Sequence, residues 1–213
     1  MQTTRARRPR GRPRGYDEGA ALDAAMTTFW RKGYAATSLD DLTGAMGIRR
    51  SSLYAAYEDK ETLFRRAIDR YAETRIGPLL AKLDEGETLE DGLRAFGQRL
   101  VDLVAGDPAT PGCLVTCVLA DAAGDDMAMR EILRSRFDAL EATFIARLAR
   151  AVDAGELRAE TDVIGLASIF VSVARGVTLR ARAGALPAEL ARTVGATIDM
   201  VLAAHRPTAG AGP

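Results

Sequence analysis

Four consecutive residues, Arg49, Arg50, Ser51 and Ser52, have side chains suited to hydrogen-bonding another molecule. One arginine can donate two hydrogen bonds to a guanine edge, and a serine hydroxyl can bond a base or a phosphate. Hydroxyl and ammonium groups that reach phosphate oxygens follow on the next turns: Tyr54, Tyr57 and Lys60. We therefore predict a DNA-contacting surface. The alternative is an ordinary solvated arginine pair followed by serines that cap a helix.

Two short helices joined by a glycine turn must position these side chains. Ser38 and Asp41 have the spacing of a capping box, which predicts a helix from Leu39 to Met46 that closes at Gly47. Glycine adopts the left-handed backbone of such a turn at little cost. The next helix is expected from about Arg50 to Tyr57. This order is typical of a helix-turn-helix, whose second helix enters the major groove of DNA.

The same two helices need an apolar side that packs on a core. We expect it from Leu39, Leu42, Ala45 and Met46 on the first helix, with Leu53 facing inward from the second and Ile48 anchoring the turn. Thr37 and Ser38 precede the first helix. Its free N–H groups and its dipole favour a phosphate there, so both residues join the predicted DNA contacts.

An arginine-rich segment, residues 1–15, precedes these helices. Six arginines and no acidic residue occur in it: Arg5, Arg7, Arg8, Arg10, Arg12 and Arg14. We expect a disordered arm in which Arg14 contacts DNA, either along the minor groove or through non-specific attraction to phosphates. Residues 1–75 carry 15 Lys and Arg against 10 Asp and Glu, and residues 76–213 carry 14 against 19. This difference in net charge between the two parts of the chain indicates that a nucleic-acid-binding function belongs to the N-terminal part.

The segment from about residue 11 to residue 71 resembles the N-terminal domain of the TetR family of bacterial transcriptional regulators. The resemblance includes the F-x-x-x-G-Y element at Phe29 to Tyr34, the Thr37-Ser38 start, the Leu53-Tyr54 pair, Tyr57 and the x-K-E-x-L-F element at Asp59 to Phe64. It implies a homodimer on a palindromic double-stranded operator. It also implies a small-molecule inducer that binds between the middle helices, moves the helix at residues 60–71 and releases the DNA.

The whole chain is expected to be all-α, with about nine helices and no strand. Outside the helix-turn-helix, helical spacing and caps predict helices over residues 17–32, 59–71, 88–105, 112–123, 127–154, 161–183 and 187–205. Gly77-Pro78 is expected to break the chain. The predicted organisation is an arm at 1–15, a DNA-binding domain at 16–75, a ligand-binding and dimerisation domain at 76–205 and a flexible tail at 206–213.

Apolar and small residues cover most of the predicted helix at residues 161–183, and the last helix is also rich in apolar residues. A helix that is apolar nearly all round needs cover on more than one side. This agrees with the family's dimer, in which the last two helices of each chain form a four-helix bundle. The alternative is a core within a single chain.

Several apolar residues of the middle helices are candidate walls of an inducer pocket: Phe96, Leu100, Phe137, Phe144 and Phe170. They indicate a hydrophobic or aromatic ligand, and the alternative is ordinary core. Cys113 and Cys117, one helical turn apart, are further pocket candidates. Three roles stay open for the pair: small buried hydrophobic residues, a thiol or electrophile sensor that controls a repressor, and metal ligands. As metal ligands the two cysteines lack partners, because the single histidine, His205, lies near the C-terminus. We predict no metal and, separately, no cofactor.

Composition argues against other classes of protein. Two cysteines indicate no disulfide framework, the N-terminus lacks an apolar signal core, and no uninterrupted apolar run approaches the roughly 20 residues of a membrane span. We expect a cytoplasmic protein without membrane partners. A phosphate-binding glycine loop and a paired nucleophile and base are both absent from the sequence, so we predict no enzymatic activity. A scaffold that uses its basic arm for non-specific binding is the remaining alternative.

Overall fold

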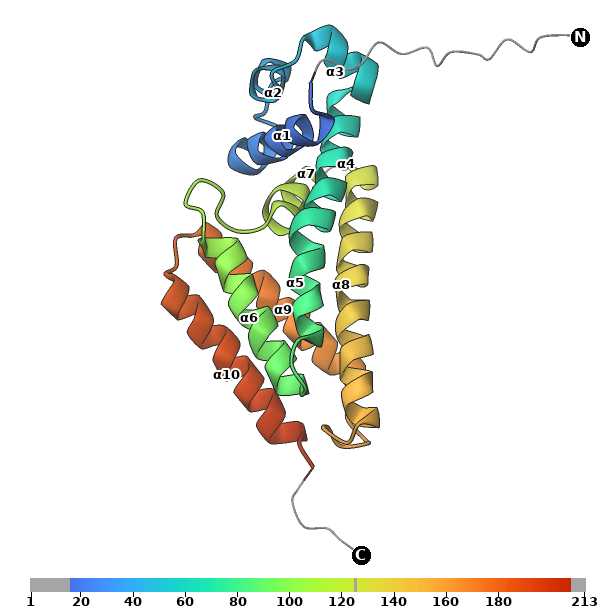
Figure 1. The fold of residues 1–213 in the computed structure, drawn as a ribbon, viewed down its shortest axis with the longest axis vertical. Helices are drawn as coiled ribbons and strands as arrows, with labels where there is room; N and C mark the ends of the chain where they lie inside the picture. The colour runs from blue at the N-terminus through green and yellow to red at the C-terminus, as the bar shows by residue number, and fades with distance from the viewer. Residues whose placement is uncertain (1–15, 125, 208–213) are drawn as a thin grey trace, which may run out of the picture.

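The computed structural model describes residues 16–124 and 126–207, and within these ranges the protein is helical, with no strand (Figure 1). Four α-helices form an N-terminal lobe: α1 (Glu18–Lys32), α2 (Leu39–Met46), α3 (Arg50–Tyr57) and α4 (Lys60–Tyr71). The elements that follow are η1 (Ala72–Ile76), α5 (Gly77–Ala81), η2 (Lys82–Asp84), α6 (Leu89–Ala105), η3 (Leu114–Leu119), α7 (Ala120–Ala122), α8 (Met127–Asp153), α9 (Val163–Arg182) and α10 (Pro187–His205). The all-α prediction is confirmed.

Side-chain caps start the helices of the N-terminal lobe where the sequence predicts them. The Ser38 hydroxyl accepts a hydrogen bond from the Asp41 N–H, and the Asp41 carboxylate accepts one from the Ser38 N–H, which is the predicted capping box. Asp59 caps α4 in the same manner by accepting from the Thr62 N–H. The core between these helices contains Phe29 and Phe64, whose rings meet edge to face at 4.9 Å.

The predicted break at Gly77-Pro78 is wrong, because the chain stays helical from α4 through η1 into α5. The η1 segment is a π-helix, and the Gly77 N–H donates to the carbonyl of Ala72, five residues earlier. Pro78 lies in the first turn of α5, where the N–H that proline lacks is not needed. One continuous helical path therefore connects the N-terminal lobe to the rest of the molecule (Figure 1).

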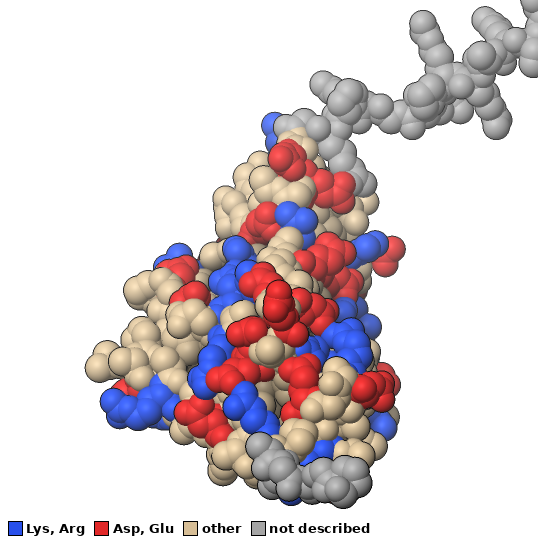
Figure 2. Space-filling model, turned by 60° about the horizontal axis from the view of Figure 1, so that its bottom comes forward, with Lys and Arg blue, Asp and Glu red and all other residues tan. Residues whose placement is uncertain are grey.

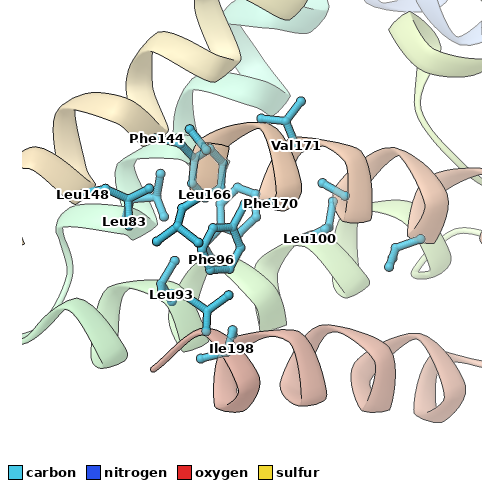
Figure 3. Close-up of a cluster of buried hydrophobic side chains, with 14 of the residues drawn as sticks. Leu83, Leu93, Phe96, Leu100, Phe144, Leu148, Leu166, Phe170, Val171 and Ile198 are labelled. Atoms are coloured by element: carbon cyan, nitrogen blue, oxygen red, sulfur yellow. The ribbon is translucent and has the colours of Figure 1, made fainter. Parts of the chain in front are cut away.

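Helices α6, α8, α9 and α10 pack around a second core. Three phenylalanines meet in it: the Phe96 and Phe144 rings lie edge to face at 5.0 Å, and the Phe144 and Phe170 rings stack at 5.5 Å. Figure 3 shows these rings among Leu93, Leu166 and other aliphatic side chains from the same helices. This C-terminal lobe therefore has an apolar interior of its own.

The segment around η3 joins the two lobes. Residues 112–123 were expected to form one helix, but helical structure begins at Leu114 with π-type hydrogen bonding. Leu114, Val118 and Leu119 are buried in the core of the N-terminal lobe together with α1 and α4. Arg182 at the end of α9 donates to the carbonyl of Trp30 in α1 at 3.3 Å. The η3 segment and Arg182 therefore provide direct contacts through which a conformational change in the C-terminal lobe can be transmitted to α1 and α4.

Basic and acidic side chains alternate on the face of the molecule seen in Figure 2. The described residues include ion pairs between segments far apart in the sequence, such as Arg94 with Asp199 at 2.7 Å. Mutual neutralisation leaves no single-sign field on this face, so it lacks the basic patch of a nucleic-acid-binding surface.

Candidate nucleic-acid interface and cavity

The turn between α2 and α3 has the geometry that a helix-turn-helix requires. Gly47 adopts a left-handed backbone with φ 65° and ψ 28°. Its N–H and that of Ile48 donate to the last carbonyls of α2, those of Gly44 and Thr43. Arg49 is the N-cap residue of α3, so the two arginines and two serines occupy the N-terminal end of the recognition helix.

Solvent reaches most of the predicted base-contacting residues of α3. Arg49, Arg50 and Ser51 are exposed and Ser52 is half-buried. The Tyr54 side chain is 47% exposed, whereas Leu53 is fully buried as predicted. Arg50 Nη2 lies 3.1 Å from Asp40 Oδ1 on α2, and both side chains remain largely exposed. Such an ion pair is weak and can exchange for a contact with another molecule.

Two side chains that were predicted to contact phosphates are buried. Tyr57 is 3% exposed and packs in the core of the N-terminal lobe, so its ring cannot reach a phosphate in this structure. Thr37 is 1% exposed, and its hydroxyl donates to the carbonyl of Gly33 at 2.6 Å. Ala45, expected on the apolar side of α2, is exposed instead. The spacing of Leu53 and Tyr57, four residues apart, already placed both on one face of α3.

Ser38 and Lys60 both have partners within the protein. The Ser38 hydroxyl is exposed but donates to Asp41, whose pKa is held well below its usual range by hydrogen bonds from Lys32 and Ser38. Acidic residues in the first turn of α2 oppose a phosphate there. Lys60 Nζ lies 4.5 Å from the centre of the Tyr34 ring, and partial burial lowers the pKa of the lysine. Arg14 and the rest of the predicted arm lie outside the described residues.

A cavity of about 220 Å³ lies between the middle helices of the C-terminal lobe and the α4–α5 path. Its wall includes four of the predicted pocket residues: Phe96, Leu100, Cys113 and Phe137. Ile76, Leu79 and Leu80 of η1 and α5 complete an apolar side that the predictions did not include. The wall also contains two arginines that they missed, Arg136 on α8 and Arg175 on α9. The available signal for Arg175 was its position as the first charged residue of α9, whose other charges, Arg180 and Arg182, lie in the last turn of the helix.

The other predicted pocket residues lie elsewhere, which corrects the prediction. Phe144 is fully buried in the phenylalanine cluster and Phe170 packs beside it, so both rings contribute to core packing rather than to the wall of this cavity (Figure 3). Cys117 packs close to Gly112, where an added Cβ would lie 2.9 Å from its Sγ. Four of the seven predicted pocket residues therefore line this cavity, and their contact with a ligand stays a prediction.

The two cysteines are free thiols, Cys113 buried and Cys117 half-buried. Burial raises the pKa of Cys117, which lowers the fraction of reactive thiolate at neutral pH. This agrees with the small-hydrophobic role for Cys117, and thiol sensing by the pair stays a prediction. Within residues 16–124 and 126–207, no three His, Cys, Asp or Glu side chains gather as a metal site.

Helix α9 is long and apolar enough to cross a membrane by length and composition, although the sequence was expected to contain no such segment. One face of α9 belongs to the core of the C-terminal lobe, through Leu166, Phe170 and Val177. Ile164, Ile169 and Leu179 remain exposed. A core helix of a water-soluble protein meets the same criteria of length and composition.

The α2–α3 unit, with its glycine turn, has the arrangement of a DNA-binding helix-turn-helix. It lies on a lobe that a continuous helical path connects to a larger helical lobe with a cavity. Together these features define a helix-turn-helix transcriptional regulator. Comparisons with known proteins agree. The profile described as bacterial regulatory proteins, tetR family, matches residues 21–67, and the profile described as tetracyclin repressor-like, C-terminal domain, matches residues 90–197. The chain belongs to the TetR family of bacterial transcriptional regulators.

Individual relatives agree with this assignment. The chain is 32% identical over 195 residues to the HTH-type transcriptional repressor ComR of Escherichia coli, covering 91% of this chain and 93% of ComR. It is 32% identical to the repressor BdcR of the same organism, covering 70% of this chain and 75% of BdcR. A cysteine-substituted form of the TetR family regulator CifR, solved with 26-base-pair operator DNA, superposes with a TM-score of 0.82 at 31% identity, covering 88% of this chain and 98% of CifR.

Proposed function

We propose that this protein is a transcriptional repressor that acts in the cytoplasm, binds a palindromic operator as a homodimer and leaves it when a small molecule occupies the cavity. The observation that carries the proposal is the exposed N-terminal end of α3 beside the ordered Gly47 turn. The family supports it, since ComR and BdcR are named repressors and CifR is solved on double-stranded operator DNA.

Arg49, Arg50 and Ser51 are our proposed base contacts, because they are exposed at the end of α3 that faces into the groove in a helix-turn-helix. Ser52 and Tyr54 are proposed phosphate contacts, whereas Ser38 caps α2 through Asp41. We assign Lys60 a positioning role, since its contact with the Tyr34 ring connects the start of α4 to the end of α1. Tyr57 and Thr37 support α3 and α2 from within the core.

The proposed dimer interface is the exposed side of α9 and α10. Large apolar side chains remain open to solvent there in one chain, including Ile164 (63% exposed), Leu179 (54%) and Met200 (62%). Gly176 and Gly195 have no atom within 4 Å of where a Cβ would be, so both helices can be approached closely. Burying these side chains against a second copy removes apolar surface from water. Leu179→Asp should shift the protein toward monomer in analytical ultracentrifugation, with Met127→Asp, on an exposed residue of α8, as the control.

The continuous path from α4 to α5 supports the proposed ligand response. Ile76 and Leu79 line the cavity, and α4 begins directly after the recognition helix. A molecule that displaces the cavity wall would tilt the N-terminal lobe and change the distance between the two recognition helices of a dimer. A ligand shifts that equilibrium only by its difference in affinity for the two states.

Selection of binding sites from random duplexes, followed by footprinting at moderate salt, tests the proposal. We expect a palindromic site protected by a dimer, and binding that falls as salt rises. Equal affinity for every duplex, with no enriched site, would instead favour a non-specific scaffold. Small molecules that raise the melting temperature of the protein then become inducer candidates, because they bind the folded state.

A further inference from the structure

Two guanidinium groups interrupt the apolar wall of the cavity. Arg175 enters it from α9 and Arg136 from α8, while the other side chains of the wall are aliphatic, aromatic, cysteine or threonine. No acidic residue belongs to the wall among the described parts of the chain. Because a charged group next to apolar surface is costly unless something compensates it, these two arginines call for an explanation.

Arg175 has little compensation from the protein. Its Cζ atom lies 3.6 Å from the centre of the Phe137 ring, and its buried Nε has no hydrogen-bond partner within the described residues. Burial lowers the pKa of this guanidinium, and the carboxylates of Glu141 and Asp138 oppose that effect only through space. The aromatic contact holds the guanidinium over a ring, and its N–H groups are left to bond an acceptor.

Arg136 connects the same cavity to α4. Its Nη2 donates a hydrogen bond to Asp69 Oδ1, while its Nε is buried without a partner. Asp69 lies in the part of α4 that continues into η1 and α5. An anion in the cavity would compete with Asp69 for the guanidinium of Arg136, and so would weaken a contact between α8 and α4.

We propose that the cavity binds a small organic carboxylate with an apolar body, whose charge is bound by Arg175 and Arg136. The carboxylate would accept hydrogen bonds from the guanidinium groups, and the body would contact Phe96, Leu100 and Leu140. This inference rests on the proposed ligand-responsive function and adds the chemical class of the ligand and the contact through which binding reaches α4.

Matched acids and neutral amides test the proposal. The probes are octanoate, 4-phenylbutyrate and 1-naphthoate, each compared with its primary amide by isothermal titration calorimetry on the full chain. The variants are Arg175→Met, which keeps an apolar stem, Arg175→Lys, which keeps the charge, and Arg136→Met. Arg134→Met is the control, since it removes one positive charge from an exposed position of α8 outside the cavity. Circular dichroism establishes that each variant is folded.

We expect at least one acid to bind roughly tenfold or more tightly than its amide, which is the size expected for hydrogen bonds to a charged group. Arg175→Met should abolish this preference, Arg175→Lys should keep part of it, and Arg134→Met should leave it unchanged. The proposal is overturned if no acid binds at roughly millimolar concentration, if acid and amide bind equally, or if folded Arg175→Met and Arg136→Met both keep the preference.

Measuring how far each acid and each amide releases the protein from operator DNA distinguishes a failure of this inference from a failure of the proposed function. If neutral amides release DNA as well as acids do, the ligand response stands and the carboxylate assignment fails. If acids bind with the expected preference but leave operator affinity unchanged, the carboxylate site stands and the ligand response fails.

Discussion

Replacing Arg50 with alanine should weaken operator binding and leave the fold intact. Arg50 is exposed, and its only ion pair in the described residues is with Asp40, across 3.1 Å between two largely solvated side chains. An exposed pair of this kind contributes about 0–1 kcal/mol to stability. The free energy of unfolding should therefore change by less than about 1 kcal/mol, too little to unfold the N-terminal lobe.

The loss of DNA affinity should be larger than the loss of stability. A good bidentate contact to a base contributes about 1–3 kcal/mol. Since Arg50 must exchange its pair with Asp40 for the DNA contact, we expect the lower part of that range, about 1–2 kcal/mol for each half-site. This corresponds to a roughly 5- to 30-fold weaker Kd per half-site.

Fluorescence anisotropy with the selected operator and a scrambled duplex measures this loss across a salt series. A base contact predicts a greater loss on the operator than on the scrambled duplex. A phosphate contact predicts an equal loss of affinity on both duplexes, and a slope of log affinity against log salt concentration that is smaller in magnitude by about one. Arg65→Ala is the matched control, because Arg65 is a half-buried arginine on α4 paired with Glu61 at 2.6 Å. Unchanged operator affinity in Arg50→Ala, or an equal loss in Arg65→Ala, would refute the assignment.

Three further substitutions or measurements test the structure. Gly47→Ala should destabilise the protein by about 1 kcal/mol in urea unfolding, because φ is 65° and an added Cβ meets nothing within 4 Å; the helical control Gly44→Ala should be neutral or stabilising. Asp23 accepts from Arg70 Nε at 2.8 Å, and this contact lowers the pKa of Asp23. Because the pKa of Asp23 is lower in the folded chain than its value of about 3.9 in the unfolded chain, the ionised carboxylate stabilises the fold at pH values above about 3.9. This stabilisation is lost as the pH falls through the folded-state pKa. Asp23→Asn should therefore show a shallower loss of stability between about pH 5 and pH 3, and an unchanged slope would count against the pair. Iodoacetamide should modify Cys117 more slowly in the native chain than in urea at pH 7.5, since burial raises its pKa; equal rates would contradict that burial.

Local rules account for the agreement between predicted and observed helix ends. The capping box at Ser38 and Asp41, the left-handed Gly47 and the proline at the start of α10 act within one helical turn, so they can be recognised without knowing the fold. The prediction of a break at Gly77-Pro78 was wrong, because the rule that a Gly-Pro pair ends a helix takes no account of packing. Proline is tolerated in the first turn of a helix, and Pro78 lies in the first turn of α5, directly after the π turn at η1.

The exposure of the candidate DNA-contacting residues was partly predictable for the same reason. Helical periodicity places Leu53 and Tyr57 on one face of α3, and that face proved to be the buried one. The hydroxyl of Tyr57 and the position of Thr37 before a helix N-terminus suggested phosphate contacts, but residue type and position along the chain do not show whether a side chain is buried.

Sequence alone determined the class of this protein: an all-α chain with a helix-turn-helix whose turn, caps and exposed arginines are local features within residues 37–60. Only the tertiary structure decided where the cavity lies and what lines it. The wall combines residues from Ala72 to Thr178 on separate elements, and whether Phe144 fills the core or Arg175 enters the cavity depends on how those elements pack. Side-chain periodicity gives the face of one helix, but a cavity is the space that several helices leave between them.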